Sequence, residues 1–305
     1  MTTSEYRFER FSDEKFDDLI QLFRSGDRYF SRAFFKKKFN TSYTGISNVG
    51  YMAYQINSGT PVAFICVFPV FLQVDGNEIL AAQTGDAITH PLHRKKGLFI
   101  LLAKKTFDLC RVLGIRIVFT FPNNNSAHGF FRKLNFVEDG KINRYSIILN
   151  SGIIQKLIQK ILPENYFKWR FKSFNEWTPP ATCDNQISVM RNLAYRNYKL
   201  FNEKYVYVRN EVSITFKINH GLHIGNIYFH KKLSSDELLK IINQLARITF
   251  SNQVVMFFSE FMNEHSYLLK PYLCNDGFFR TGRLNLEPGF ESKHLVFSFE
   301  DFDTF

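Results

Sequence analysis

A single strand–helix–strand run constrains the fold of this chain more than any other feature of its sequence. An apolar strand ends near His90, a long helix follows from Leu98 to Leu113, and Gly114 ends that helix before the apolar strand 115–121. A connection that contains a whole helix joins strands that pair in parallel, because a tight turn joins only antiparallel neighbours. The run therefore predicts one parallel strand pair with a helix on a face of the sheet.

The strands before this run are joined by tight turns. Ser58–Gly59 and Asp75–Gly76 separate three apolar stretches between residues 50 and 90, and such turn pairs are typical of β-hairpins. Apolar residues at helical spacing precede them at 12–26 and 28–39. The sequence predicts an α/β fold of the mixed α+β kind, with a central mixed, mostly antiparallel sheet flanked by helices.

The order of elements restarts near residue 150. Residues 166–171, YFKWRF, resemble residues 34–39, FFKKKF, and strands are expected after both segments. The second half is expected to contain helices at 151–161, 235–248 and 264–273, a loop at 176–186, and strands at 204–209, 211–218, 222–229 and 253–258. We predict two domains, 1–150 and 151–305, related by duplication, although a chance match of two aromatic and basic helix faces is an alternative.

Charge and cysteine content exclude several classes of protein. A net charge of +11 over 305 residues favours anionic partners, but the basic residues form no tail or arginine-rich run, which argues against a dedicated nucleic-acid binder. The four cysteines are far apart and the histidines lack ligand spacing, so neither a metal site nor a disulfide framework is expected. Without an apolar signal segment or a run of about 18 apolar residues, we expect a cytoplasmic protein with no membrane span.

The loop before the long helix has the composition of an anion site. A helix start already carries partial positive charge, so cations there are unfavourable unless an anion binds. Pro91 stops the preceding strand, Gly97 permits a backbone conformation that other residues resist, and the unpaired N–H groups can donate together to a phosphate. The run suits a pyrophosphate and is neither a Walker loop nor GxGxxG. The loop consists of Arg94, Lys95, Lys96, Gly97, Leu98 and Phe99.

Residues 81–140 resemble the core of the GNAT acyltransferase superfamily. That family pattern is a strand, the loop [QR]-x-x-G-x-[GA], a helix, a strand, an Asn-containing turn and a short helix ending in Y-x-K-L-G-F. Here residues 94–99 read RKKGLF and residues 131–136 read FRKLNF, on either side of the predicted crossover. The resemblance extends over roughly residues 5–149.

The resemblance implies acetyl-CoA, or another acyl-CoA, as the cofactor. Its pyrophosphate would bind the backbone of 94–99, and its pantetheine arm would extend the sheet at the strand end formed by Ile88, Thr89 and His90. Side chains after the next strand would lie close to the arm and thioester, namely Asn123, Asn125, Ser126 and Phe131.

Two residues depart from the family pattern. The last glycine of the loop is replaced by Phe99, which narrows the space over the phosphate. The tyrosine that often protonates the leaving thiolate is replaced by Phe131, which has no proton to give. Because a thiolate is a good leaving group, an acid helps but is not always required. The alternatives are an acid at His128, one helical turn earlier, or loss of catalysis.

Direct transfer from a thioester to an amine needs a general base. Asp86 is the only carboxylate of the strand that should flank the thioester, and His90 lies at the end of that strand. Strict alternation would place both on one face together with Thr84 and Ile88. The structural alternatives are an ion pair for Asp86 and a hydrogen bond to a loop carbonyl for His90.

The second half lacks an equivalent loop. The residues before helix 235–248, HKKLSSDEL, contain no glycine, offer Ser234 or Ser235 as a cap, and place acids in the first turn, which would repel phosphate. We therefore expect a second GNAT-like domain without cofactor. It would shape the acceptor cleft or only stabilise its neighbour.

These features lead to one functional hypothesis and two alternatives. The hypothesis is an acyl-CoA-dependent N-acyltransferase, acetyl-CoA being the first choice, that acts on the amine of a small molecule such as an amino sugar or nucleotide-linked sugar. One alternative is a tRNA-dependent aminoacyl transferase of related tandem fold. The other is a non-catalytic protein that binds acyl-CoA or another ligand. A homodimer stays open.

Overall fold

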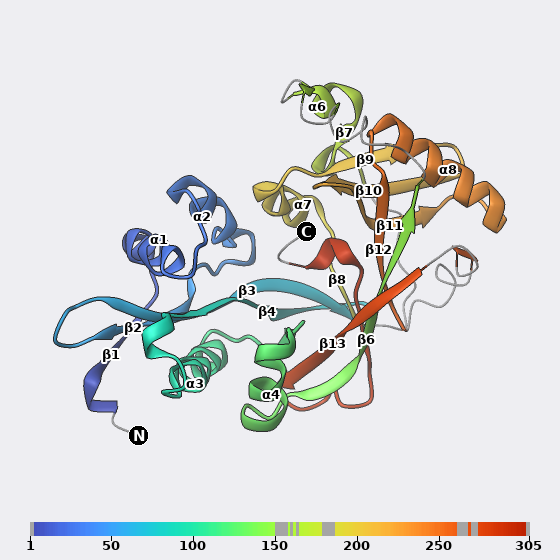
Figure 1. Ribbon diagram of the computed structural model, residues 1–305. Coiled ribbons are helices and arrows are strands. Elements are labelled where there is room, and N and C mark those ends of the chain that lie inside the picture. The colour runs from blue at the N-terminus through green and yellow to red at the C-terminus, as the bar shows by residue number, and fades with distance from the viewer. Residues whose placement is uncertain are drawn as a thin grey trace. The chain divides into compact units, whose positions relative to one another are not determined.

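The computed structural model describes residues 3–149, 158, 161–162, 165–178, 187–260, 268–269 and 274–302 (Figure 1). The chain separates into two compact units: unit 1 comprises Met1–Asp139 and Thr281–Lys293, and unit 2 comprises Gly140–Arg280 and His294–Phe305. This division differs from the predicted boundary in two places. Residues 140–150 belong to unit 2, and residues 281–293 belong to unit 1.

The sheet of unit 1 is mixed and mostly antiparallel, as predicted. In spatial order its strands are β1 (Tyr6–Arg10), β2 (Val49–Gln55), β3 (Pro61–Val74), β4 (Asn77–Thr89), β5 (Ile117–Thr120) and the end of β13 (Cys274–Asn285). Only β4 and β5 pair in parallel among these neighbours. Helix α3 (Leu98–Val112) joins them, so the predicted crossover is confirmed.

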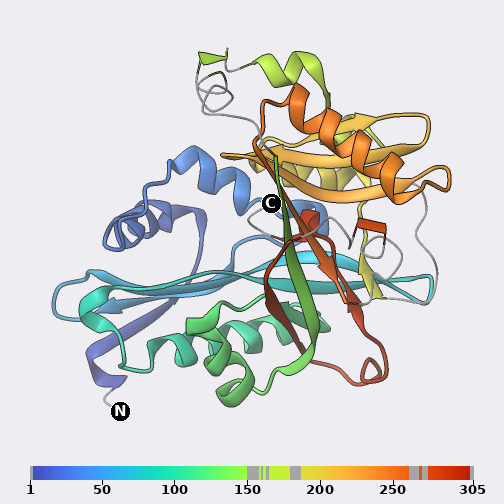
Figure 2. The ribbon, with the colours of Figure 1, turned by 45° about the vertical axis from the view of Figure 1, so that its right-hand side comes forward.

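Helices cover both faces of this sheet (Figures 1 and 2). Helices α1 (Phe16–Arg24) and α2 (Arg32–Lys38) lie on one face, and α3 and α4 (Asn124–Lys133) lie on the other. The α1–α2 face packs an aromatic core that includes Phe11, Phe16, Phe23, Phe35, Phe39, Phe64, Cys66 and Phe68. The α3–α4 face packs mainly aliphatic residues, including Ala63, Ile65, Val67, Ala82, Leu98 and Leu102. Successive residues of β3 thus alternate between the two cores, which fixes the face of each residue.

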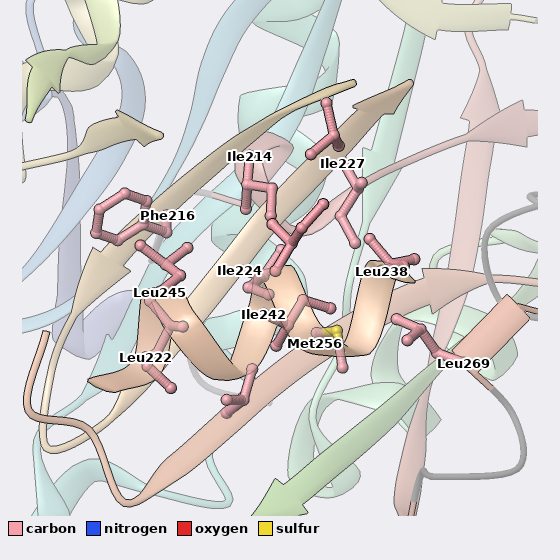
Figure 3. Close-up of a cluster of buried hydrophobic side chains, with 14 of the residues drawn as sticks. Ile214, Phe216, Leu222, Ile224, Ile227, Leu238, Ile242, Leu245, Met256 and Leu269 are labelled. Atoms are coloured by element: carbon pink, nitrogen blue, oxygen red, sulfur yellow. The ribbon is translucent and has the colours of Figure 1, made fainter. Parts of the chain in front are cut away.

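Unit 2 repeats the crossover of unit 1. In spatial order its strands are β6 (Val137–Ile148), β12 (Gln253–Ser259), β11 (Leu222–Phe229), β10 (Val212–Ile218), β9 (Tyr205–Val208) and β7 (Lys172–Ser173). Strands β11 and β12 are parallel and are joined by α8 (Ser235–Ile248), whereas the other neighbours are antiparallel. Figure 3 shows how this helix packs on the strands, through Leu238, Ile242, Leu245, Ile214, Ile224 and Met256.

Shorter elements complete the described chain. They are helices α6 (Tyr166–Arg170) and α7 (Leu193–Tyr198), strands β8 (Ile187–Val189) and β14 (Leu295–Val296), and the 3-10 turns η1 (Thr3–Glu5), η2 (Asp13–Lys15), η3 (Ser42–Thr44), η4 (Pro91–His93), η5 (Phe174–Glu176), η6 (Lys199–Phe201) and η8 (Phe299–Asp301). Most of the helices predicted at 151–161 and 264–273, and residues 179–186 of the predicted loop, lie outside the described residues.

In each unit one strand pairs with a strand that is more than 100 residues away in the sequence. Strand β6 follows α4 along the chain, yet it pairs with β12 and belongs mainly to unit 2. Conversely, the end of β13 pairs with β5 in unit 1. Within the described ranges, no helix is long and apolar enough to cross a membrane, and no group of three or more His, Cys, Asp or Glu side chains is placed to hold a metal ion.

Candidate functional site

Helix α3 begins at the predicted loop with its first amides free. Gly97 is the N-cap residue, with a φ of 79°, and no side chain caps the helix. Lys95 also has a positive φ, 62°, which is uncommon for a residue with a Cβ. In the described chain, no protein group accepts a hydrogen bond from the backbone N–H groups of residues 95–100. Several adjacent N–H groups at one helix start therefore remain available for an anion.

The side chains around this loop add positive charge. Arg94, Lys95 and Lys96 are exposed, and Arg94 Nε donates to the Thr89 carbonyl at 3.4 Å, which links the loop to the end of β4. Tyr6, followed by the Glu5 carboxylate 3.8 Å away, raises the pKa of Lys96. Lys96 therefore stays charged at neutral pH.

Phe99 does not lie free over the loop. Its ring packs edge-on against Phe130, with centroids 5.4 Å apart, and reaches the backbone of Gly129 in α4. A Cβ at residue 129 would stand 2.7 Å from Phe99 Cε1, so glycine is required there. Phe99 stands where the family pattern has the last glycine of the loop. It fits there because its ring packs against α4.

A β-bulge in β4 overturns the predicted alternation of residues 83–90. Ile65 pairs with Ala87, but Val67 pairs with Thr84, so two residues of β4 oppose Cys66. Thr84 therefore shares the α3–α4 face with Val67, and its hydroxyl donates to Thr120 at 2.7 Å. The prediction that Thr84, Asp86, Ile88 and His90 share one face is wrong for Thr84, because an extra residue reverses the pleat.

Asp86 lies on the α1–α2 face and forms an ion pair there. Lys38 Nζ donates to Asp86 Oδ2 at 2.8 Å, and both side chains are largely buried, with exposed fractions of 7% for Lys38 and 17% for Asp86. Ile88 packs against the same aromatic core. Lys38 was not among the predicted site residues, although its spacing from Phe35 and Phe39 signals the buried side of α2.

The two predicted histidines occupy different settings. His90 Nδ1 accepts from the Leu92 N–H at 3.3 Å, which caps the turn η4. The ring thus bonds to a backbone N–H of the loop, and not to a loop carbonyl as the structural alternative had it. Its ring lies 5.6 Å from that of His93, whose pKa is lowered by burial and then by the nearby Lys96. His128 is exposed on α4.

The Asn-containing turn is a helix cap. The Asn123 side chain accepts from the N–H groups of Asn125 and Ser126 at 3.0 and 3.1 Å, and the Ser126 hydroxyl donates back to it. Asn125 and Asn123 are exposed, and Ser126 is half-buried. This local geometry explains why α4 begins here, and it leaves the Asn125 side chain open to a ligand.

The second signature forms the end of α4. Phe131 packs over Gly282 of β13, where a Cβ would stand 2.5 Å from its ring. Asn135 takes the glycine position of the family pattern and has a φ of 59°, and the Phe136 N–H donates to the Phe130 carbonyl at 3.1 Å. Asparagine tolerates this conformation better than most residues, so the helix ends as the glycine-containing pattern would.

Comparison with known families and structures places these features in context. Residues 8–137 match the family model of the acetyltransferase (GNAT) domain, a range that contains the loop, β4 and the whole of α4. No curated protein matches the chain.

Solved structures share the fold at low sequence identity. A GCN5-related N-acetyltransferase from Kribbella flavida is 12% identical with a TM-score of 0.60, over 92% of this chain and 71% of that one. A putative acetyltransferase from Pyrococcus horikoshii is 14% identical with a TM-score of 0.58, over 98% and 95%. Saccharomyces cerevisiae N-myristoyltransferase with bound myristoyl-CoA is 13% identical with a TM-score of 0.57, over 93% and 84%. Because these matches cover more than nine-tenths of the chain, the likeness extends over both units.

Proposed function

We propose that unit 1, whose residues 8–137 match the family model of the acetyltransferase (GNAT) domain, binds acyl-CoA and transfers its acyl group to the amine of a small molecule. The observation that carries the proposal is the open start of α3. Among the residues that the structure describes, none accepts a hydrogen bond from its N–H groups of residues 95–100, and exposed cations stand beside them. A diphosphate supplies both the acceptors and the negative charge that this loop lacks.

The residues of unit 1 fit an acyl-CoA on two further points. Arg94 of the loop is hydrogen-bonded to the carbonyl of Thr89 at the end of β4, so a molecule bound on the loop has the half-buried end of β4 beside it. The bulge at residues 85–86 interrupts the regular pairing of β4 with β3. The thioester of acyl-CoA supplies an activated acyl group, with a thiolate as leaving group.

Asp86 is the proposed proton acceptor for the attacking amine. The ion pair with Lys38, 2.8 Å from Asp86 Oδ2, holds this side chain in place on β4. His90 is the alternative acceptor, through its ring or through a water. In the balanced reaction, the N–C bond forms as the C–S bond breaks, the amine proton passes to the base, and the thiolate is released or protonated from solvent. Phe131 supplies no proton, and exposed His128 is the candidate acid on α4.

The acceptor is proposed to be an amine of small size, with an amino sugar or nucleotide-linked sugar as the first class to test. The net charge of +11 favours a negatively charged acceptor such as a nucleotide-linked sugar. Unit 2 is proposed to be a second GNAT-like domain that binds no acyl-CoA, because its corresponding helix is capped by its own side chains.

Two measurements on the full chain test this function. Acetyl-CoA should raise the unfolding temperature, with a stabilisation that follows RT ln(1 + [L]/Kd) and reaches about 2.7 kcal/mol at 100 Kd. Acetyl-CoA should then release free thiol in the presence of glucosamine, a UDP-linked amino sugar or a simple alkylamine. Stabilisation without amine-dependent thiol release would favour the non-catalytic alternative, and no stabilisation would refute the loop assignment.

A further inference from the structure

Unit 2 contains a buried charged cluster on the face of its sheet that is opposite α8. Residues of β10 and β11 that alternate with the α8 core point into it. There Glu300 is fully buried and accepts hydrogen bonds from the Thr215 hydroxyl at 2.9 Å and from the Tyr228 hydroxyl. A charged side chain that is buried inside a domain is stable only when groups of opposite charge or hydrogen-bond partners surround it.

Arg191 neutralises the carboxylates of this cluster. Its Nε and Nη2 donate to both oxygens of Asp301, at 2.9 and 2.6 Å, and its Nε also lies 2.7 Å from Glu300 Oε1. The Ser298 N–H donates to Asp301 as well, at 2.9 Å. Both carboxylates therefore have their partners, and neither forms a hydrogen bond with the second arginine nearby.

That second arginine, Arg196 of α7, is buried without a partner. Its residue is only 4% exposed, and its Nε and Nη1 are enclosed with no acceptor in the described chain. The third guanidinium nitrogen, Nη2, is not among the enclosed atoms. It can donate to a planar acceptor in a pair with Nε or in a pair with Nη1. Burial lowers the pKa of Arg196, while nearby Tyr228 and Glu300 oppose that shift. A guanidinium stays charged in proteins, so the desolvation of Arg196 is left uncompensated.

The described cluster holds more basic groups than carboxylates. Lys204 is buried, and burial followed by Lys199 lowers its pKa well below the usual range. The ammonium of Lys199 donates to the Phe302 carbonyl, which carries no charge. Two arginines and two lysines thus stand among the carboxylates of Glu300 and Asp301, and Arg196 is the arginine without an acceptor in the described chain.

We propose that Arg196 binds the carboxylate of a small molecule in unit 2, at a site separate from the acyl-CoA loop. A planar carboxylate can accept from Nη2 together with Nε or with Nη1, which completes the guanidinium. Tyr228, whose ring packs against Trp177 with centroids 4.8 Å apart, acts electrostatically on Arg196 and is thus near it. A monoanionic carboxylate supplies negative charge to a cluster rich in basic groups, whereas a dianionic phosphate would be repelled more strongly by the nearby carboxylate of Glu300.

The test is thermal unfolding of the full chain in sodium acetate, sodium benzoate, sodium phosphate and sodium chloride at equal ionic strength. The carboxylates should raise the unfolding temperature by about 2–4 °C over chloride at saturation, and phosphate should not. Arg196→Met should abolish that rise, and without carboxylate it should unfold at the same or a higher temperature than wild type, because the unpaired charge is gone. Arg247→Met, at an exposed arginine of α8, is the matched control and should keep the rise.

Each other outcome overturns the proposal. A lower unfolding temperature of folded Arg196→Met in chloride would mean that the guanidinium has a structural role and refute the proposal. If Arg196→Met does not fold, Arg196→Lys takes its place: it keeps the charge, loses the fork, and should retain only part of the carboxylate effect, and an undiminished effect in Arg196→Lys would refute the proposal as well. An equal rise of the unfolding temperature in wild type and Arg196→Met would indicate an adventitious additive only. No rise in wild type would mean that Arg196 binds no carboxylate and is solvated by water.

Discussion

Two helices of this chain occupy the same place in the same motif and start in opposite ways. Helix α3 follows β4 and precedes the parallel strand β5, and α8 follows β11 and precedes the parallel strand β12. At α3 the N-cap is Gly97, and its first turn contains no acid. At α8 the N-cap is Ser234, which forms a capping box with Glu237, and two acids lie in the first turn.

The two helix starts differ in whether a side chain of the protein accepts hydrogen bonds from their first backbone N–H groups. A capped helix start is complete within the protein, so it has little to offer a phosphate and repels it with its carboxylates. An uncapped start with cations beside it is incomplete until an anion binds. The same fold therefore makes a binding site in one unit and a stable helix end in the other, and the predictions below separate the two.

The largest effect is expected at Gly97. Gly97→Asp adds a carboxylate and a side chain at a residue with φ of 79°, beside the amides proposed to bind diphosphate. We expect acetyl-CoA to bind at least about 100-fold more weakly, which is about 2.7 kcal/mol, measured by calorimetric titration. Gly114→Asp is the control, since its φ of 75° gives similar strain at the far end of α3, where a Cβ meets nothing within 4 Å. Equal binding by both variants would refute the loop assignment.

The second-largest effect is expected on the rate of acyl transfer in unit 1. No such reaction is proposed for unit 2, which contains α8. Asp86→Asn removes the proposed proton acceptor and should lower kcat by about 10²–10⁴-fold while the stabilisation by acetyl-CoA persists. Asp18→Asn is the control, because Asp18 is a carboxylate of α1 that likewise has a side-chain partner, accepting from the Tyr54 hydroxyl at 2.7 Å. Unchanged turnover in Asp86→Asn would leave Asp86 as a structural partner of Lys38 only.

Much of this fold follows from the sequence, because local signals decide it. Turn pairs such as Asp75–Gly76, both with positive φ, fix the hairpins, and Gly114 ends α3 where predicted. The capping of α8 by Ser234 is confirmed as well. The local pattern does not show which strands pair with each other. The residues of β6 and β13 would alternate in the same way in either unit, so the sequence does not reveal that β6 pairs with β12 and β13 with β5.

The site is predicted less completely for a similar reason. The loop depends on consecutive residues, so the open start of α3 can be expected from the sequence, and the anion that its amides would bind stays a prediction. The orientation of Asp86 relative to Thr84 depends on a bulge of one residue, which leaves no mark on the apolar pattern of β4. Lys38 reaches Asp86 only through the packing of α2 on the sheet, so its role emerges from tertiary structure.

The strand that unit 1 takes from the C-terminal part of the chain gives the third prediction. Gly282→Ala places a Cβ 2.5 Å from the Phe131 ring and 3.2 Å from the Val137 carbonyl, and should destabilise the protein by about 1–3 kcal/mol in chemical denaturation. Phe131→Leu should recover part of this loss in the double variant. If Gly282→Ala is neutral, β13 packs on α4 less closely than described.

At α8 a smaller change is expected. Ser234→Ala removes the side chain that accepts from the Glu237 N–H at 3.3 Å, and should lower the stability by about 1 kcal/mol. The stabilisation by acetyl-CoA should stay that of wild type, because this helix start is not proposed to bind the cofactor. A weaker acetyl-CoA response would mean that both helix starts take part in binding, and the contrast between the units would fail.

The smallest effect is a pH dependence at the same cap. The Ser234 N–H and hydroxyl each donate to the Glu237 carboxylate at 2.8 Å, and these bonds lower its pKa from the ordinary value of 4.5. A carboxylate with a lowered folded-state pKa stabilises the fold fully above its unfolded value, and that contribution disappears as the pH falls through the folded value. The unfolding temperature of wild type should therefore approach that of Glu237→Gln as the pH drops below 4.5, and the difference between them should be constant at higher pH. Other carboxylates titrate in both proteins, so they cancel in this difference. A constant difference down to strongly acidic pH would show that Glu237 acts through its shape alone and that its charge contributes nothing to the closed start of α8.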